Sequence, residues 1–251
     1  MRIIRANIIL LGGLLLGFLS AILQWFANFY DEYLGFINFI IRRWEQVLEY
    51  TANHFSLVLT VMFFSLILWI SVGLLISRYE KLANTAFGIG NILFVIPSIS
   101  LFGIFITIPM LGLGRTSAAL ALVLYAMMPM VRNVYRGIKS VEWPIIEAGR
   151  GMGMSPRQIL LQIQIPMAWP IIFAGIRVTV VMITGIATVA TFIGERNLGR
   201  FIHHGIARES ADMIIAGAVL VSVIAILLDY ILGKIEYKIT SPGLRKEQDS
   251  S

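Results

Sequence analysis

The segment 147–166, EAGRGMGMSPRQILLQIQIP, places charged residues and glycines between long apolar runs. Glu147 to Met152 can form a short helix, and Gly153 supplies the permissive backbone that ends it. The carboxylate of Glu147 could contact another protein, or it could simply stabilise the start of its own helix by about 0.3–1 kcal/mol. This pattern is typical of a docking loop, whose chemistry is recognition between proteins and not catalysis.

A second helix is expected directly after this glycine. Ser155 is a good N-cap, Pro156 suits the first helical position, and Gln158 completes the spacing of a capping box. Pro166 and Pro170 are expected to close this helix and to turn the chain back. The segment is therefore predicted to hold two short helices separated by a glycine turn.

Patterns that indicate other chemistry are missing from the sequence. Residues 112–116, GLGRT, lack the spacing and the lysine of a phosphate-binding loop. His203 and His204 are adjacent, so their side chains would not share one helix face, and no metal site is expected there. The chain has no cysteines, which excludes disulfides and thiol chemistry. Because no catalytic groups converge, the sequence does not predict an enzyme.

The elements that carry these residues are long and apolar. Hydrophobic residues make up 58% of the 251 residues and charged residues only 14%, and the mean hydropathy is +0.83. A soluble domain does not have this composition, so we expect an all-α integral membrane protein. Segments that approach the ~20 residues of a membrane-spanning helix are 8–26, 55–77, 85–108, 117–135, 171–193 and 213–232.

The basic residues predict the orientation of these spans. If the N-terminus is inside, roughly two thirds of the 20 Lys and Arg residues fall on the cytoplasmic side, as the positive-inside rule requires. Both termini and segment 147–166 are then cytoplasmic. The net charge of +6 is spread over several loops, so it does not indicate a nucleic-acid partner. Basic residues between 234 and 246 favour contact with anionic membrane lipid.

Two segments lie outside the main group of spans. The first apolar run could be a secretory signal, but no clear cleavage site follows it, so we expect a retained anchor helix. Residues 27–54 mix aromatic and charged residues, with Ile37, Ile41, Trp44 and Leu48 at helical spacing. This pattern predicts an interfacial helix on the outer face of the membrane.

The docking segment resembles the EAA loop of ABC importer permeases, which has the pattern E-A-A, three residues, G, nine residues, I-x-L-P. The matching positions include two departures, Gly149 for the usual Ala and Ile165 for the usual Leu. The resemblance implies a loop that couples the permease to a separate ATPase, and its candidate residues are Glu147, Ala148, Gly149, Gly153, Ile165 and Pro166.

Residues 124–135, LYAMMPMVRNVY, are similar to the L-Y-A-L-L-P-I-V-R-N-T-Y signature of osmoprotectant permeases, which import glycine betaine, carnitine, choline and related compounds. Residues 96–98, 175–177 and 194–199 also resemble elements of that subfamily. The resemblance implies a core of five helices like that of methionine permeases, plus one N-terminal helix. It divides the chain into an anchor and interfacial part (1–54), a permease core (55–232) with a coupling loop (139–170), and a cytoplasmic tail (233–251).

This family implies a set of partners in a bacterial plasma or inner membrane. They are an ATPase dimer that binds ATP and Mg²⁺, a periplasmic or extracellular substrate-binding protein, and a second permease copy. The chain itself is expected to bind no cofactor. Departures from the subfamily pattern, at Phe94-Val95 and at 195–197, predict a heterodimer with a more typical permease. Candidate residues of the substrate path are Phe94, Pro97, Ser98, Tyr125, Pro129 and Glu195.

Pro97 and Pro129 are expected to interrupt the third and fourth spans, and interrupted spans line pathways more often than they face lipid. Three other functions stay open. The first is an ABC permease for amino acids such as methionine. The second is an ion-coupled secondary transporter, which would need ionisable groups inside its spans, whereas only Arg177 and Asp229 lie near span ends. The third is a purely structural membrane subunit.

Overall fold

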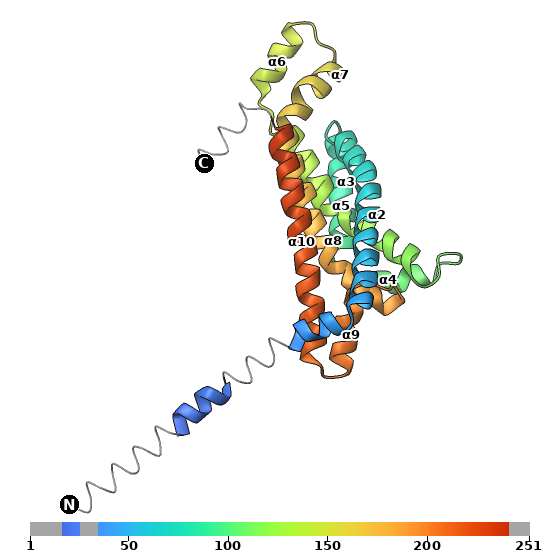
Figure 1. Ribbon diagram of the computed structural model, residues 1–251. Coiled ribbons are helices and arrows are strands. Elements are labelled where there is room, and N and C mark those ends of the chain that lie inside the picture. The colour runs from blue at the N-terminus through green and yellow to red at the C-terminus, as the bar shows by residue number, and fades with distance from the viewer. Residues whose placement is uncertain (1–16, 26–34, 241–251) are drawn as a thin grey trace, which may run out of the picture.

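The computed structural model describes residues 17–25 and 35–240, and all regular structure in these ranges is helical (Figure 1). The predicted first span, 8–26, thus lies mostly outside the described residues. Four helical segments of the described residues are long and apolar enough to cross a membrane, and a bent pair of helices brings this number up to five. The prediction of an all-α membrane protein is confirmed.

Four long helices form the body of the protein: α2 (Trp44–Ile76), α5 (Arg115–Lys139), α8 (Ile165–Ala187) and α10 (Ala211–Ile239). Helix α5 packs against both α2 and α8, while α10 packs against α8. Most of the buried residues of α5 are apolar or small, so α5 contributes many residues to the core. Its central position explains why it is the most buried of the long helices.

Two glycines allow the long helices to approach each other closely. A Cβ atom at Gly73 of α2 would lie 2.6 Å from a side-chain atom of Val134 in α5. A Cβ atom at Gly175 of α8 would lie 2.4 Å from the Cβ of Asn133, also in α5. Real Cβ contacts are not this short, so larger residues at either position would push the helices apart.

The predicted third span, 85–108, is broken at Pro97. Helices α3 (Glu80–Val95) and α4 (Ser98–Ile106) meet there at 96°, and α4 turns sideways in Figure 1. The expected interruption at Pro129 is wrong, because α5 runs through this residue without a break. A proline removes one hydrogen bond of the helix and costs about 3 kcal/mol, and the extensive packing of α5 outweighs that cost.

The expectation that Pro166 and Pro170 end a helix is also wrong. Helix α7 (Pro156–Ile159) continues through a π-helical turn (Leu160–Gln164) into α8, and a 3₁₀ turn (Thr188–Ile193) follows. The π-helical turn widens the helix just before Pro166, which reduces the clash of a proline ring with the preceding turn. The predicted span 171–193 is therefore only the second half of a longer helical segment.

The predicted interfacial segment 27–54 is helical where the structure describes it. Residues 35–42 form a helix, the chain turns at Arg43, and α2 begins at Trp44. The ring of Phe39 packs edge-on against Phe201 of α9 (Gly199–Ala207), at 5.2 Å between centroids. The proposed divisions at 54 and 232 fall inside α2 and α10, and the division of the chain into three parts stays a prediction.

Candidate functional site

The docking segment forms two helices that project from one end of the helical body (Figure 1). Helix α6 (Trp143–Gly151) has Met152 as its C-cap, and Gly153 follows in the left-handed region with φ of +79°. The hydroxyl of Ser155 accepts a hydrogen bond from the backbone N–H of Gln158, and the Gln158 side chain accepts one from the N–H of Ser155. The glycine turn and the capping box are therefore confirmed.

The six candidate coupling residues differ in their surroundings. The side chains of Glu147 and Ala148 are exposed on α6, as a docking contact requires. Gly149 is buried, and a Cβ atom there would lie 2.9 Å from the end of the Ile163 side chain. The usual Ala of the motif would therefore need a small shift of Ile163, which is a flexible neighbour. The remaining three follow the turn: Gly153 and Pro166 are exposed, and Ile165 is half-buried.

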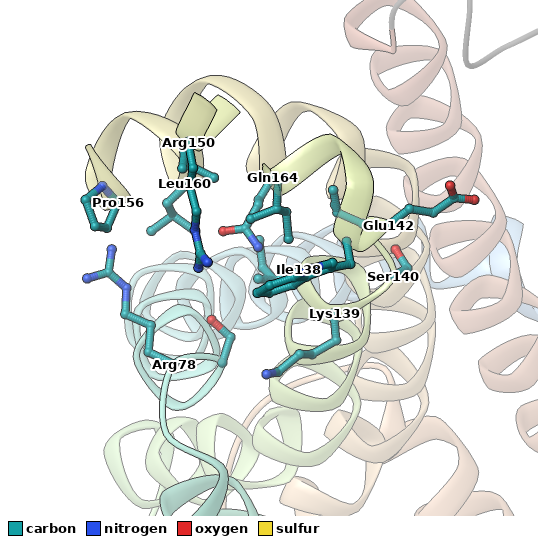
Figure 2. A pocket seen from close by; sticks show the side chains of 14 residues that line it. Arg78, Ile138, Lys139, Ser140, Glu142, Arg150, Pro156, Leu160 and Gln164 are labelled. Atoms are coloured by element: carbon teal, nitrogen blue, oxygen red, sulfur yellow. The ribbon is translucent and has the colours of Figure 1, made fainter. Parts of the chain in front are cut away.

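A cavity of about 620 Å³ lies between this loop and the ends of α2 and α5 (Figure 2). Three cationic side chains line it, namely Arg78 after α2, Lys139 at the end of α5 and Arg150 on α6. The only carboxylate among the lining residues is that of Glu142, and Figure 2 shows it pointing away from the cations. All three belong to the basic residues that the positive-inside rule places on the cytoplasmic side, but the sequence did not predict that they share one cavity.

Candidate path residues gather at the bend between α3 and α4. The hydroxyl of Tyr125 donates a hydrogen bond to the carbonyl of Ile96, directly before Pro97. The ring of Phe94 lies edge-on to Tyr125, with 6.3 Å between centroids, and 47% of Phe94 is exposed. Ser98 begins α4 on the other side of the bend. Pro129 lies about one turn further along α5 than Tyr125.

Glu195 does not join this group. It lies in the loop after α8, where its carboxylate is 3.4 Å from the guanidinium of Arg115 at the start of α5. Since α5 rises ~1.5 Å per residue, Arg115 and Tyr125 are ~15 Å apart along that helix. Burial raises the pKa of the Glu195 carboxyl, and the positive charge of Arg115 partly opposes this effect. Arg115 also donates to the hydroxyl of Ser56, at 2.8 Å.

The same loop contains a hydrogen-bonded asparagine that the sequence had not indicated. The side chain of Asn197 is fully buried, donates to the carbonyl of Ala187 at 2.7 Å and accepts from the N–H of Gly199 at 2.8 Å. Among the described residues of this loop only Gly194 has a positive φ, of +93°. The departure from glycine at 196 and 197 therefore strains no backbone angle, and Asn197 fastens the loop to the end of α8.

A second ionic group joins α8 to α10. The guanidinium of Arg177 donates two hydrogen bonds to Asp229, at 2.8 and 2.9 Å, and one to Glu236 at 3.1 Å. Asp229 and Glu236 are seven residues apart and so lie on one face of α10. These ionisable groups satisfy each other, which favours a structural role over ion transport.

The described residues contain no group of three His, Cys, Asp or Glu side chains placed to hold a metal ion. His203 instead lies edge-on to Phe192, at 4.5 Å between ring centroids.

Comparison with known proteins matches residues 66–246 to the family described as binding-protein-dependent transport system inner membrane component. The chain is 34% identical to the choline transport system permease protein OpuBB of Bacillus subtilis, over 86% of this chain and 98% of the relative. It is 38% identical to the osmoprotectant import permease protein OsmW of Salmonella typhimurium, over 78% and 92%.

Two further relatives from Bacillus subtilis are each named as a glycine betaine/carnitine/choline transport system permease protein. OpuCB is 36% identical over 82% of this chain, and OpuCD is 31% identical over 90%. Among solved structures, a chain of the inward-facing MetNI methionine ABC transporter has a TM-score of 0.69, with 21% identity, covering 79% of this chain and 98% of that one. At this identity the likeness supports the fold alone.

Proposed function

Because the chain belongs to the family of binding-protein-dependent transport system inner membrane components, we propose that it is the permease of an ATP-driven importer of osmoprotectants. The substrates are quaternary ammonium compounds such as glycine betaine, carnitine or choline. The observation that carries this proposal is identity of 34–38% to permeases named for these substrates, along nearly their whole length. An amino-acid permease is less well supported, because the methionine transporter resembles this chain in fold at only 21% identity.

The partners follow from this function. A separate ATPase dimer binds ATP and Mg²⁺ and docks on the loop of α6 and α7, where Glu147 and Ala148 are exposed. A substrate-binding protein delivers the substrate at the opposite end, near the loop of Glu195. Both termini and the docking loop are then cytoplasmic, in a bacterial plasma or inner membrane. Transport alternates between outward and inward access as closure of the ATPase moves the coupling loop.

A second permease completes the pathway, and we infer that it is a different chain. Two distinct permease proteins of Bacillus subtilis, OpuCB and OpuCD, share the name of a glycine betaine/carnitine/choline transport system, and both resemble this chain. This chain departs from the subfamily pattern at Phe94 and at residues 195–197, and we expect the partner permease to have the typical residues at these positions. Purification of this chain alone, as a fully active permease pair with its ATPase, would contradict the heterodimer.

We propose that the substrate passes the bend at Pro97. Phe94 and Tyr125 present aromatic rings there, and cations such as quaternary ammonium groups are held by aromatic faces. We propose that the separate binding protein, and not this chain, discriminates among betaine, choline and carnitine.

The first experiment is uptake of labelled glycine betaine in medium of high osmolarity. Cells with the wild-type chain, with Glu147→Lys and without the chain are compared, with ATPase and binding protein present throughout. We expect uptake only with the wild-type chain, because the charge reversal weakens ATPase docking. Glu80→Lys, an exposed glutamate at the same end but outside the loop, is the matched control and should keep uptake. If uptake does not depend on the chain, the osmoprotectant assignment fails.

A further inference from the structure

The cavity beneath the docking loop has the charge and the position of an anion site. Its cations come from three separate elements, with Arg78 between α2 and α3, Lys139 at the end of α5, and Arg150 on α6. Within the described parts of the chain, no carboxylate lies within ion-pair distance of any of the three. We propose that this cavity binds a phosphate-bearing anion, and that the headgroup of an anionic phospholipid is its source in the membrane.

Electrostatics favours an anion here. Three like charges around one cavity repel each other, and a phosphate placed among them removes that repulsion and gains charge-assisted hydrogen bonds. Figure 2 shows Arg78, Lys139 and Arg150 around the same space, with the carboxylate of Glu142 directed away from it. Arg78 and Arg150 supply planar guanidinium groups, which match phosphate oxygens in pairs.

The shape of the cavity fits a lipid headgroup. Its volume of about 620 Å³ exceeds that of a bare phosphate, and part of its wall is apolar. The guanidinium of Arg150 lies 4.8 Å from the centre of the Trp143 ring, which holds that cation at the cavity wall. Apolar wall residues give the glycerol and the first carbons of the acyl chains a surface to contact: Ile138, Ile146, Ile159 and Leu160.

The position of the cavity also favours lipid. It is lined by Ser77 and Arg78, directly after α2 ends at Ile76, and by Lys139, the last residue of α5. The ends of two membrane-spanning helices mark the level of the lipid headgroups. Tryptophan is enriched at this level of membrane proteins, and Trp143 is 56% exposed.

The competing occupant is an acidic side chain of the ATPase. Trp143, Ile146 and Arg150 recur along α6 at spacings of three and four residues and face the cavity, whereas Glu147 and Ala148 are not among its lining residues. The α6 surface assigned to the ATPase is therefore separate from the surface that lines the cavity. Anion binding in this cavity is independent of which substrate the permease transports.

The test uses the whole permease complex in lipid discs of phosphatidylcholine with a minor fraction of phosphatidylglycerol. Native mass spectrometry then counts the phosphatidylglycerol that stays bound. We expect preferential retention by the wild-type complex and about fivefold less in Arg78→Gln and in Arg150→Gln, since a basic residue near an anionic membrane is worth ~1 kcal/mol. Arg157→Gln is the matched control, because Arg157 belongs to the same loop but does not line the cavity.

A second arm separates the two sources of phosphate. Inorganic phosphate is titrated into the complex in neutral detergent, and its binding is followed by calorimetry. Phosphate binding that both variants lose, without selective lipid retention, would keep the anion site and assign it to a soluble ligand. Absence of both kinds of binding would overturn the proposal. So would unchanged lipid retention together with loss of the ATPase in Arg78→Gln, because the cations would then belong to the ATPase contact.

Discussion

Asn197→Ala tests how the loop after α8 is held. The Asn197 amide pairs two backbone groups, the carbonyl of Ala187 and the N–H of Gly199, and it is fully buried. Alanine would leave both groups without this partner, and a buried unpaired group costs about 1–3 kcal/mol. Because the loop can relax in part, we expect the free energy of unfolding to fall by about 2–4 kcal/mol.

The assay is thermal unfolding of the purified chain in detergent. For a chain of this size, 1 kcal/mol corresponds to about 2–4 °C in Tm, so Asn197→Ala should lower Tm by roughly 4–16 °C. The control is Arg196→Ala next to it, whose side chain is 69% exposed and lies 3.9 Å from the Glu49 carboxylate. An exposed pair of this kind is worth about 0–1 kcal/mol, so Tm should move little. Equal shifts in the two variants would refute the role given to the buried amide.

Three other predictions use the loops and the bend. Gly153→Val should distort the docking loop, because Gly153 has φ of +79° and a β-branched residue disfavours this left-handed conformation. Co-purification with the ATPase should therefore fall. The control Gly151→Ala should leave co-purification unchanged. Tyr125→Phe removes the donor to the Ile96 carbonyl and should lower Tm by about 2–4 °C, while the exposed Tyr79→Phe should not. Burial raises the pKa of Glu195, so the folded state binds more protons than the unfolded state between the ordinary and the raised value. Stability should therefore fall as pH rises through that window, and Glu195→Gln should abolish this slope in Tm measured against pH.

Local features of the docking loop could be predicted from the sequence. The capping box of Ser155 and Gln158 depends on a spacing of three residues, and the turn at Gly153 depends on one residue type, so no distant part of the chain decides them. The spans within the described residues could be predicted as well, because the membrane sets their composition, whereas the predicted first span, 8–26, stays a prediction. The break at Pro97 was predicted, whereas the break at Pro129 was not found, because burial of α5 stabilises a helix that its proline alone would disfavour.

Features that join distant residues could not be predicted. Arg115 and Glu195 are 80 residues apart in the sequence, and Arg177 and Asp229 are 52 apart. An arginine in the sequence does not indicate which distant carboxylate it will pair with. The cavity of Arg78, Lys139 and Arg150 belongs to the same class, because only the folded chain brings the ends of α2, α5 and α6 together.

The helical segment 156–193 has a mechanical consequence. Since α7 runs into α8 through the π-helical turn without a loop, the docking end and the interior of the membrane share one stiff rod. On its other side the docking loop joins α5 through Ser140–Glu142, a short non-helical link. If the ATPase docks on this loop as proposed, we expect a displacement of the loop to tilt α8, because the non-helical link to α5 is the more flexible of the two connections. The π-helical turn, Leu160–Gln164, lies within this rod and separates the α-helical part at the docking end from the α-helical part in the membrane.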